Sequence, residues 1–284
     1  MFSKRLISPK LFLSLLFFSA ATHADSSVNT HPDSHMLVEM IRGDRPYHQS
    51  PAMESIPDDR YGGDVDLGFK IFTQTRKYAG RYSGNNLKCS SCHLDSGRKP
   101  NAAPLWAAYG MYPAYRKKND QNNTLEERIQ QCFRFSLDGF APALDAPEIK
   151  ALVSYAHFLA RGIPVGIDLP GRGYPQIVDT GFDPSPSRGE NIYQQKCVEC
   201  HGQNGEGILS EEQVIFPPLW GLQSYNKGAG FFQNNLLAGF IRANMPLGQD
   251  WSLTDQEALD LAAYINLQIR PPDPRKGLLE GLLE

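Results

Sequence analysis

The 284-residue sequence predicts an all-α protein of two small domains joined by a linker rich in proline and glycine. A Cys-x-x-Cys-His run occurs twice, at 89–93 and 197–201, and the two histidines are 108 residues apart, about the length of one small domain. Between the runs, residues 160–186 collect glycines and prolines and show little helical periodicity. The chain has 25 glycines and 21 prolines, so many loops are expected between its helices.

The first 24 residues are expected to form a secretory signal peptide. Lys4, Arg5 and Lys10 precede a short apolar stretch at 11–20, and Thr22–Ala24 offers a small-residue cleavage site. That stretch is too short to span a bilayer, although an N-terminal membrane anchor is the alternative. No other stretch approaches the ~18 uninterrupted apolar residues of a transmembrane helix, so no span is expected in the mature chain. We therefore expect export, with a bacterial periplasm as the location.

The first domain should contain at least three helices. Residues 67–77 form an expected first helix, and apolar positions between Leu125 and Phe133 recur at helical spacing. Asp145 is expected to cap a further helix that continues to about residue 161. The predicted segments of the whole chain are a signal peptide 1–24, an arm 25–60, a first domain 61–163, a linker 164–186, a second domain 187–272 and a tail 273–284.

Two capping boxes frame the second domain. Ser187 and Glu190 are expected to open its first helix, and Thr254 and Glu257 its last, which should stop before Pro271. This layout resembles a class I cytochrome c domain over nearly all of residues 187–270. The first domain repeats the plan with longer insertions, so the fold class is two class I cytochrome c-like domains.

Each Cys-x-x-Cys-His run is typical of a covalent c-type haem site. Two cysteines form thioethers to the porphyrin, and the adjacent histidine ligates the iron. A redox or zinc Cys-x-x-Cys is the alternative for a single run, but two runs in an exported chain favour two covalently bound haem c groups. The residues that would hold them are Cys89, Cys92 and His93 in the first site and Cys197, Cys200 and His201 in the second.

The sixth ligand of the second haem iron has few candidates. Met245 lies 44 residues beyond His201 and is followed by proline, an arrangement typical of the distal loop of this domain type. Lys227 is a weaker alternative, and Met245 as plain core packing is another. Thioether ligation raises the reduction potential, which suits a haem through which electrons leave.

The first haem offers Cys132, Met111 and His157 as distal ligands. Cys132 is the one cysteine outside the two runs, and an unpaired thiol in an oxidising compartment is a liability unless it is ligated or catalytic. Arg128 precedes it by one helical turn and Arg134 follows it by two residues; such cations stabilise a thiolate and attract anions. We expect Cys132 to be a ligand or a nucleophile, the alternative being an inert buried thiol.

Charge is distributed unevenly along the chain. The formal net charge is −3, but residues 70–134 hold twelve Lys or Arg against four acids, about +8. This segment is either a solvated basic face or an electrostatic funnel for a small anion near the first haem. It lacks any nucleic-acid recognition signature, so a nucleic-acid partner is not expected.

The two haem motifs, the isolated cysteine in the segment Cys132–Gly139 and the later Asn244-Met245-Pro246 together resemble the dihaem thiosulfate dehydrogenases, over most of residues 60–270. The resemblance implies an enzyme that couples two thiosulfates to tetrathionate with release of two electrons, some members working readily in reverse. A small cytochrome c or similar protein would accept the electrons. It also implies that Cys132 is the distal ligand of the first haem with Ser136 beside it, and that Met245 serves the second haem.

One departure from the family pattern concerns the anion-binding arginine. Phe135 stands directly before Ser136, where an arginine is expected, and Arg134 lies one place earlier. Which cation binds substrate therefore stays open, and the candidates are Arg116, Lys118, Arg128 and Arg134.

Two other functions fit the same motifs. One is a SoxA-like sulfur-oxidation subunit, which also uses a cysteine-ligated haem but modifies a carrier protein. The other is a non-enzymatic dihaem electron-transfer cytochrome with Met111 and Met245 as ligands and Cys132 inert. A dihaem peroxidase is disfavoured because no histidine follows His201.

Overall fold

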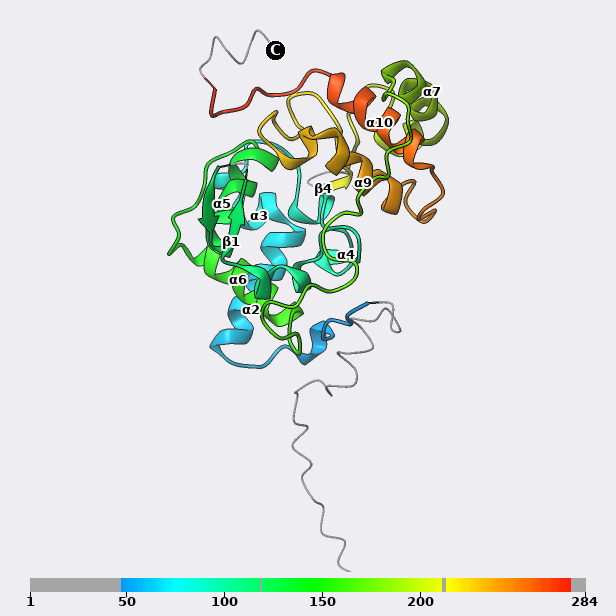
Figure 1. Cartoon of the computed structure of the whole chain (residues 1–284). Coiled ribbons are helices and arrows are strands. Elements are labelled where there is room, and N and C mark those ends of the chain that lie inside the picture. The colour runs from blue at the N-terminus through cyan, green and yellow to red at the C-terminus, as the bar shows by residue number, and fades with distance from the viewer. Residues whose placement is uncertain (1–46, 118, 211–212, 277–284) are drawn as a thin grey trace, which may run out of the picture. The chain divides into compact units, whose positions relative to one another are not determined.

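The computed structural model describes residues 47–117, 119–210 and 213–276, and these are mostly helical (Figure 1). The predicted signal peptide, residues 25–46 of the predicted arm and residues 277–284 of the tail lie outside this description. None of the helices in the described part combines the length and apolar character that a membrane crossing needs. The α-helices are α2 (Arg60–Thr73), α3 (Thr75–Ala79), α4 (Leu94–Gly97), α5 (Leu125–Gln131), α6 (Pro147–Leu159), α7 (Pro186–Lys196), α8 (Val198–His201), α9 (Asn234–Asn244) and α10 (Asp255–Leu267).

Two short antiparallel hairpins, which the sequence did not predict, accompany the helices. β1 (Ala114–Arg116) pairs with β2 (Gln121–Asn123), with Tyr115 opposite Asn122. β3 (Ile208–Ser210) pairs with β4 (Gln213–Phe216) through an irregular register. The first hairpin follows the first haem motif in sequence, and the second hairpin follows the second motif.

Each half of the chain is built on one close helix crossing. α2 packs on α6 in the first half, and α7 packs on α10 in the second (Figure 1). A Cβ added to Gly68 would lie 2.1 Å from the carbonyl oxygen of Ala151, and one added to Gly189 would lie 2.0 Å from that of Asp260. Only glycine permits so close an approach of two backbones. The shared crossing confirms that the halves follow one plan.

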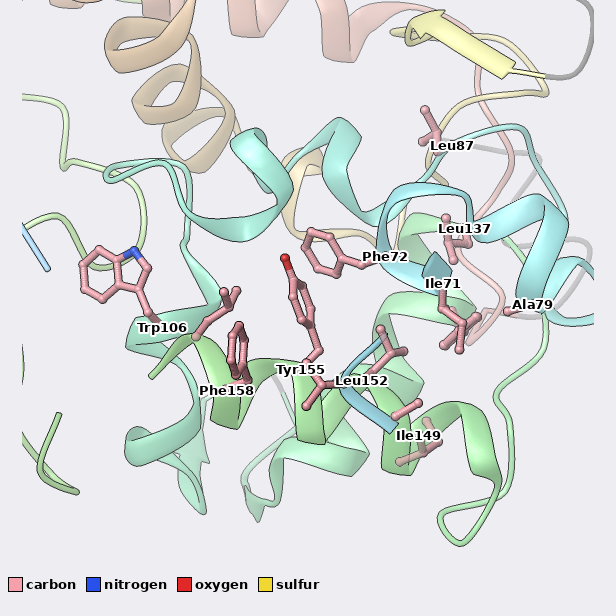
Figure 2. Packing of buried hydrophobic residues seen from close by; sticks show 14 of the residues in the cluster. Ile71, Phe72, Ala79, Leu87, Trp106, Leu137, Ile149, Leu152, Tyr155 and Phe158 are labelled. Atoms are coloured by element: carbon pink, nitrogen blue, oxygen red, sulfur yellow. The ribbon is translucent and has the colours of Figure 1, made fainter. Parts of the chain in front are cut away.

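The core of the first half lies between these two helices. Figure 2 shows Ile71 and Phe72 of α2 beside Leu152 and Tyr155 of α6, and the rings of Phe72 and Tyr155 are 5.7 Å apart. Each large apolar side chain buried in this way contributes about 1.5–3 kcal/mol. Phe72 also lies 6.0 Å, ring to ring, from His93, so this core directly supports the first haem motif.

The helix starts show where the cap predictions were right and wrong. Thr254 caps α10 in the predicted box: its Oγ1 accepts from the Glu257 amide and the Glu257 carboxylate accepts from the Thr254 amide. The predicted box at Ser187 is wrong, because α7 begins at Pro186 with Ser185 as its cap. Likewise α6 begins at Pro147 without a side-chain cap, so Asp145 does not cap it. In both helices the proline, whose fixed φ suits the first helical position, sets the start.

Other segments also differ from expectation. α2 begins at Arg60 rather than residue 67, because the Asp59 carboxylate caps it by accepting from the Gly62 amide at 2.8 Å. The predicted linker makes backbone hydrogen bonds to the first half of the chain. The amides of Asn101 and Ala103 donate to the carbonyls of Gly171 and Gly173, both at 2.8 Å, so the linker packs along the loop that follows the first haem motif.

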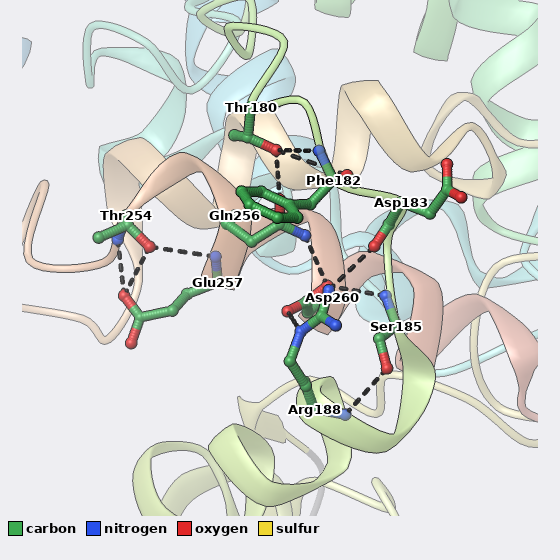
Figure 3. Close-up of polar contacts among 9 residues, drawn as sticks. All are labelled: Thr180, Phe182, Asp183, Ser185, Arg188, Thr254, Gln256, Glu257 and Asp260. Carbon is green, nitrogen blue, oxygen red and sulfur yellow. Dashed lines mark hydrogen bonds and ion pairs between the residues drawn. The ribbon is translucent and has the colours of Figure 1, made fainter.

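A buried carboxylate holds the helix crossing of the second half (Figure 3). The Asp260 side chain is 2% exposed and accepts from the Ser185 amide at 2.7 Å, from Arg188 Nε at 2.6 Å and from Gln256 Nε2 at 2.9 Å. Burial alone raises the pKa of this carboxyl, but the hydrogen bonds, that from Arg188 foremost, more than offset it, and the pKa lies below its usual range. The charged form is therefore the stable one in the fold.

We expect Asp260→Ala to lower the free energy of unfolding by about 2–3 kcal/mol, the scale of hydrogen bonds to a buried charge. Because the pKa is lowered in the fold, this contribution is complete above the ordinary carboxyl range and is lost as the pH falls through the lowered pKa. The difference between wild type and variant, measured by denaturant unfolding, should then shrink below about pH 4. Asp168→Ala is the control: its partner Arg172 and Asp168 itself are both exposed, so the loss should be ~0–1 kcal/mol at any pH. Equal losses for the two variants would contradict the assignment.

Candidate active site

The first haem motif is arranged to hold an iron through His93. Its Nδ1–H donates to the carbonyl of Ala103 at 2.6 Å, which leaves Nε2 as the metal-binding nitrogen. Cys89 and Cys92 are free thiols rather than a disulfide, and the Cys89 amide donates to Thr75 Oγ1 at 3.2 Å. The two thiols and the imidazole are thus presented together, as a covalent porphyrin requires.

The second motif repeats this arrangement. His201 Nδ1–H donates to the carbonyl of Pro217 at 2.9 Å, again leaving Nε2 for iron. A cavity of about 540 Å³ opens beside the motif and is lined by Cys197, Cys200, His201 and Met245 together with apolar side chains from α9 and α10. A large, mostly apolar space with a few placed polar groups suits a porphyrin.

Met245 reaches this cavity because α9 ends directly before it. Its amide donates to the carbonyl of Ile241 at 2.9 Å, and its side chain lines the cavity, whereas Lys227 does not. Residues of the first half, Ser91 and Cys92 among them, line the same cavity. The two haem sites therefore adjoin within the described chain.

Cys132 lies where an α-helix changes form. α5 opens with a capping box between Thr124 and Glu127 and ends at Gln131. A π-helical turn, Cys132–Ser136, follows, with the Leu137 amide donating to the carbonyl of Cys132 at 3.0 Å. The predicted middle helix is thus correct in position but does not stay α-helical. Such widened turns occur often at functional sites.

Arg128 is held against Cys132. Its Nη1 donates to the Cys132 sulfur at 3.3 Å, and the Cys132 sulfur is the main cause that raises the pKa of Arg128. Burial raises the pKa of the free Cys92 thiol to about 12, and Cys132 is the next cause in size. Cys132 therefore lies close to the first haem motif and in contact with a half-buried, charged guanidinium.

A cationic cavity of about 410 Å³ lies on the other side of Arg128. Arg128 and Ser136 line it from the α5 side and Arg116 and Lys117 from the end of β1, while the second half of the chain supplies Gln233. Arg134 is exposed and is not among the lining residues. Lys118 lies outside the described residues. The structure thus brings together Arg116, Arg128, Ser136 and, through Arg128, Cys132.

The other two candidate ligands of the first haem, His157 and Met111, make no hydrogen bond or ring contact, among the described residues, with Cys89, Cys92 or His93. His157 is exposed, its Nδ1 hydrogen-bonds Tyr61 Oη at 2.7 Å, and its ring is 4.8 Å from that of Tyr109. Met111 is half-buried in a short 3₁₀ turn, Tyr109–Met111.

Two residues of the site were not anticipated. Tyr112 contributes to the raised pKa of Arg128, and Tyr174 lies close enough to Cys92 and Arg128 for both to affect its own pKa, which burial raises. Tyr174 lies in the predicted linker, and the proline and glycine content of that segment gave no reason to expect a residue of the site there. The run of aromatic residues around Met111 was the signal that could have drawn attention to Tyr112.

Each half of the chain matches a cytochrome family model. Residues 76–165 match the family model "SoxA/TsdA, cytochrome c domain", and residues 184–265 match "Cytochrome C oxidase, cbb3-type, subunit III". The chain is 48% identical to the thiosulfate dehydrogenase of Stutzerimonas stutzeri over 240 residues, covering 84% of this chain and 77% of that protein. It is 48% identical to that of Thiomonas intermedia over 225 residues, covering 79% and 72% respectively.

A solved structure agrees with these matches. The thiosulfate dehydrogenase (TsdBA) from Marichromatium purpuratum, in its "as isolated" form, superposes with a TM-score of 0.80 at 42% identity. The match covers 82% of this chain and 52% of that one, so the chain spans about half the length of that protein. Two cytochrome c domains carry two covalent haem c groups with iron. The extent and identity of these matches show that the chain belongs to the thiosulfate dehydrogenase family.

Proposed function

We propose that this protein oxidises thiosulfate to tetrathionate in the periplasm, with Cys132 at the reacting centre and electrons leaving through the second haem to a small cytochrome c. The observation that supports this most strongly is the contact of Cys132 Sγ with Arg128, which also lines the cationic cavity. A thiol that contacts an arginine of the cationic cavity and lies beside a haem motif suits sulfur–sulfur bond formation coupled to electron transfer.

The cations of the cavity would offset the electrostatic repulsion between two thiosulfate ions, which is the main physical obstacle to the reaction. Thiosulfate is a dianion, and two of them must meet against their own repulsion. Arg116, Lys117 and Arg128 offset this charge, and guanidinium groups contact two sulfonate oxygens at once. The Ser136 hydroxyl adds a neutral hydrogen-bond donor at the same wall. These residues would hold a sulfonate so that its terminal sulfur faces Cys132.

The proposed chemistry proceeds through Cys132 as a covalent carrier. The Cys132 thiolate and the terminal sulfur of one thiosulfate form an S–S bond, which gives a cysteine S-thiosulfonate and releases two electrons. The terminal sulfur of the second thiosulfate then attacks the sulfur that is bonded to Cys132 Sγ in this adduct. The Cys132–sulfur bond breaks, the thiolate leaves and tetrathionate is formed, so that charge and atoms balance.

The haems supply one-electron acceptors for the two electrons released. In the proposal His93 would hold the first iron, together with Cys132 when Cys132 carries no sulfur adduct, and His201 and Met245 would hold the second. Adjoining haem sites fit transfer from the first to the second. The predicted signal peptide at 1–24 supports the periplasmic location.

The test is a thiosulfate-plus-ferricyanide assay on the purified holoprotein with both haems attached. We expect one ferricyanide reduced for each thiosulfate consumed, and one tetrathionate formed for each two. Turnover by the isolated chain distinguishes the enzyme from a SoxA-like subunit, which needs a carrier protein. A holoprotein that transfers electrons with small cytochromes but does not react with thiosulfate would overturn the proposal.

Ligation of the second haem gives a separate prediction. We expect Met245→His to lower the midpoint potential of the second haem while leaving that of the first unchanged, because imidazole lacks the potential-raising effect of a thioether. A redox titration followed by absorbance measures both potentials. Met111→Leu is the matched control, a volume-conserving change that should move neither potential. If Met111→Leu shifts the first haem's potential, Met111 rather than Cys132 is its ligand.

A further inference from the structure

The π-helical turn Cys132–Ser136 ends the helix, so the row of carbonyl groups after Cys132 has no donor within the helix. A helix end exposes its last carbonyls, and buried carbonyls must find other donors. The carbonyls at the two ends of this row accept from backbone amides. The Leu137 amide donates to Cys132 O at 3.0 Å, the Gly139 amide to Phe133 O at 2.9 Å, and the Gly84 amide to Leu137 O at 2.9 Å.

The three carbonyls between them are satisfied by two buried asparagines. Asn226 donates from its side chain to Arg134 O at 2.9 Å and from its backbone amide to Phe135 O at 3.1 Å. Asn85 donates from its side chain to Ser136 O at 3.0 Å. Both asparagines are 0% exposed, so water cannot replace either of them.

Asn226 comes from the second half of the chain, and it makes further bonds that fix its orientation. Its side-chain amide also donates to Asp138 Oδ1 at 2.7 Å, and its Oδ1 accepts from the Gly228 amide at 2.9 Å. Asn85 joins the two halves in the same place, since its second N–H donates to Ser224 O at 3.0 Å. The loop 224–228 therefore lies against the turn that carries Cys132.

We propose that Asn226 is a positioning residue for Cys132 and Ser136, supplied to the active site by the second half of the chain. Asn226 acts through backbone carbonyls of the turn and does not contact the cavity. Its bonds set the direction in which the turn presents the Cys132 thiol and the Ser136 hydroxyl. This inference rests on the proposed role of Cys132.

The test replaces Asn226 by alanine and by serine, which is too short to reach both Arg134 O and Asp138 Oδ1. We expect kcat for thiosulfate to fall about tenfold to 100-fold, the scale of a small misplacement of a reacting group. The KM for thiosulfate should change little, because the cavity cations remain. The electron paramagnetic resonance signals of the first ferric haem should become heterogeneous, whereas those of the second haem should not change.

The matched control is Asn266→Ala. Asn266 lies in α10. Its side chain donates to Phe231 O at 2.9 Å and to Asn234 Oδ1 at 3.0 Å and accepts from Tyr225 Oη of the loop 224–228 at 3.0 Å, but none of these bonds reaches the turn itself. It should keep the wild-type kcat and the wild-type signals of the first haem. Equal effects from Asn266→Ala and Asn226→Ala would show general loosening and overturn the proposal.

Other outcomes are also decisive. A folded Asn226 variant with wild-type kcat and spectrum overturns the positioning role, and so does global unfolding of both Asn226 variants, which would show a folding role instead. Asn85→Ala, acting on Ser136 O, should reproduce the loss of kcat. If wild-type turnover does not depend on Cys132, the proposed function fails. If it depends on Cys132 but tolerates Asn226→Ala, only the positioning role fails.

Discussion

Replacing Cys132 with glycine is expected to abolish thiosulfate-dependent ferricyanide reduction while both haems stay attached. Attachment depends on Cys89, Cys92, Cys197 and Cys200, none of which the change touches. Removal of a covalent nucleophile lowers turnover by orders of magnitude, even where substrate binding survives. Cavity cations such as Arg128 should therefore still bind thiosulfate in the inactive variant.

Three measurements separate loss of chemistry from loss of structure. The pyridine haemochrome assay should give two haems per chain for wild type and variant alike. In the denatured holoprotein the four motif cysteines would remain thioethers while Cys132 would be free of iron, so iodoacetamide should label wild type once, at Cys132, and the variant not at all. Cys132→Ser, which keeps the volume and loses the thiol, should be as inactive as Cys132→Gly. Turnover retained in either variant would contradict the covalent mechanism.

Arg128→Gln should lower kcat/KM for thiosulfate by about 10²-fold to 10³-fold, the scale seen when one preorganised donor to a developing or bound anion is removed. The reason lies in its placement: Arg128 lines the cationic cavity and donates to Cys132 Sγ at 3.3 Å. Arg128→Lys keeps the charge but loses the planar fork, so part of the loss should remain.

Arg134→Gln is the matched control for this arginine. Arg134 lies only six residues further on, but it is exposed and does not line the cavity. Its replacement should leave kcat/KM close to that of wild type. A larger loss of kcat/KM from Arg134→Gln than from Arg128→Gln would show that Arg134 binds the anion and would contradict the role proposed for Arg128.

Local chemistry made part of this molecule predictable. The Cys-x-x-Cys-His runs identify both haem motifs because porphyrin attachment needs those residues at that spacing. The capping box at Thr254 is correct because both of its partners lie within one helical turn. The predictions at Ser187 and Asp145 are wrong because prolines at 186 and 147 set the helix starts, a stronger local constraint than a side-chain cap.

The rest depends on contacts between distant residues. Arg128 lies one helical turn before Cys132 and Arg134 two residues after it, within the widened turn, and of the two only Arg128 lines the cavity. Tyr174 lies in a segment whose composition predicts a loop, and its nearness to Cys92 follows from the packing of that loop. Asn226 is 94 residues beyond Cys132, so no local pattern connects them.

The paired helix crossing has a consequence for how one scaffold serves two tasks. In the second half Cys197 lies 8 positions after the crossing glycine, Gly189; in the first half Cys89 lies 21 positions after Gly68. The extra length contains α3 and Asn85, whose side chain meets the Ser136 carbonyl. In the proposed function, a common frame thus carries the electron-transfer site where the connection is short and the reaction site where it is long. The difference between the two sites then depends on the length of chain after a glycine as much as on the residues proposed to bind substrate.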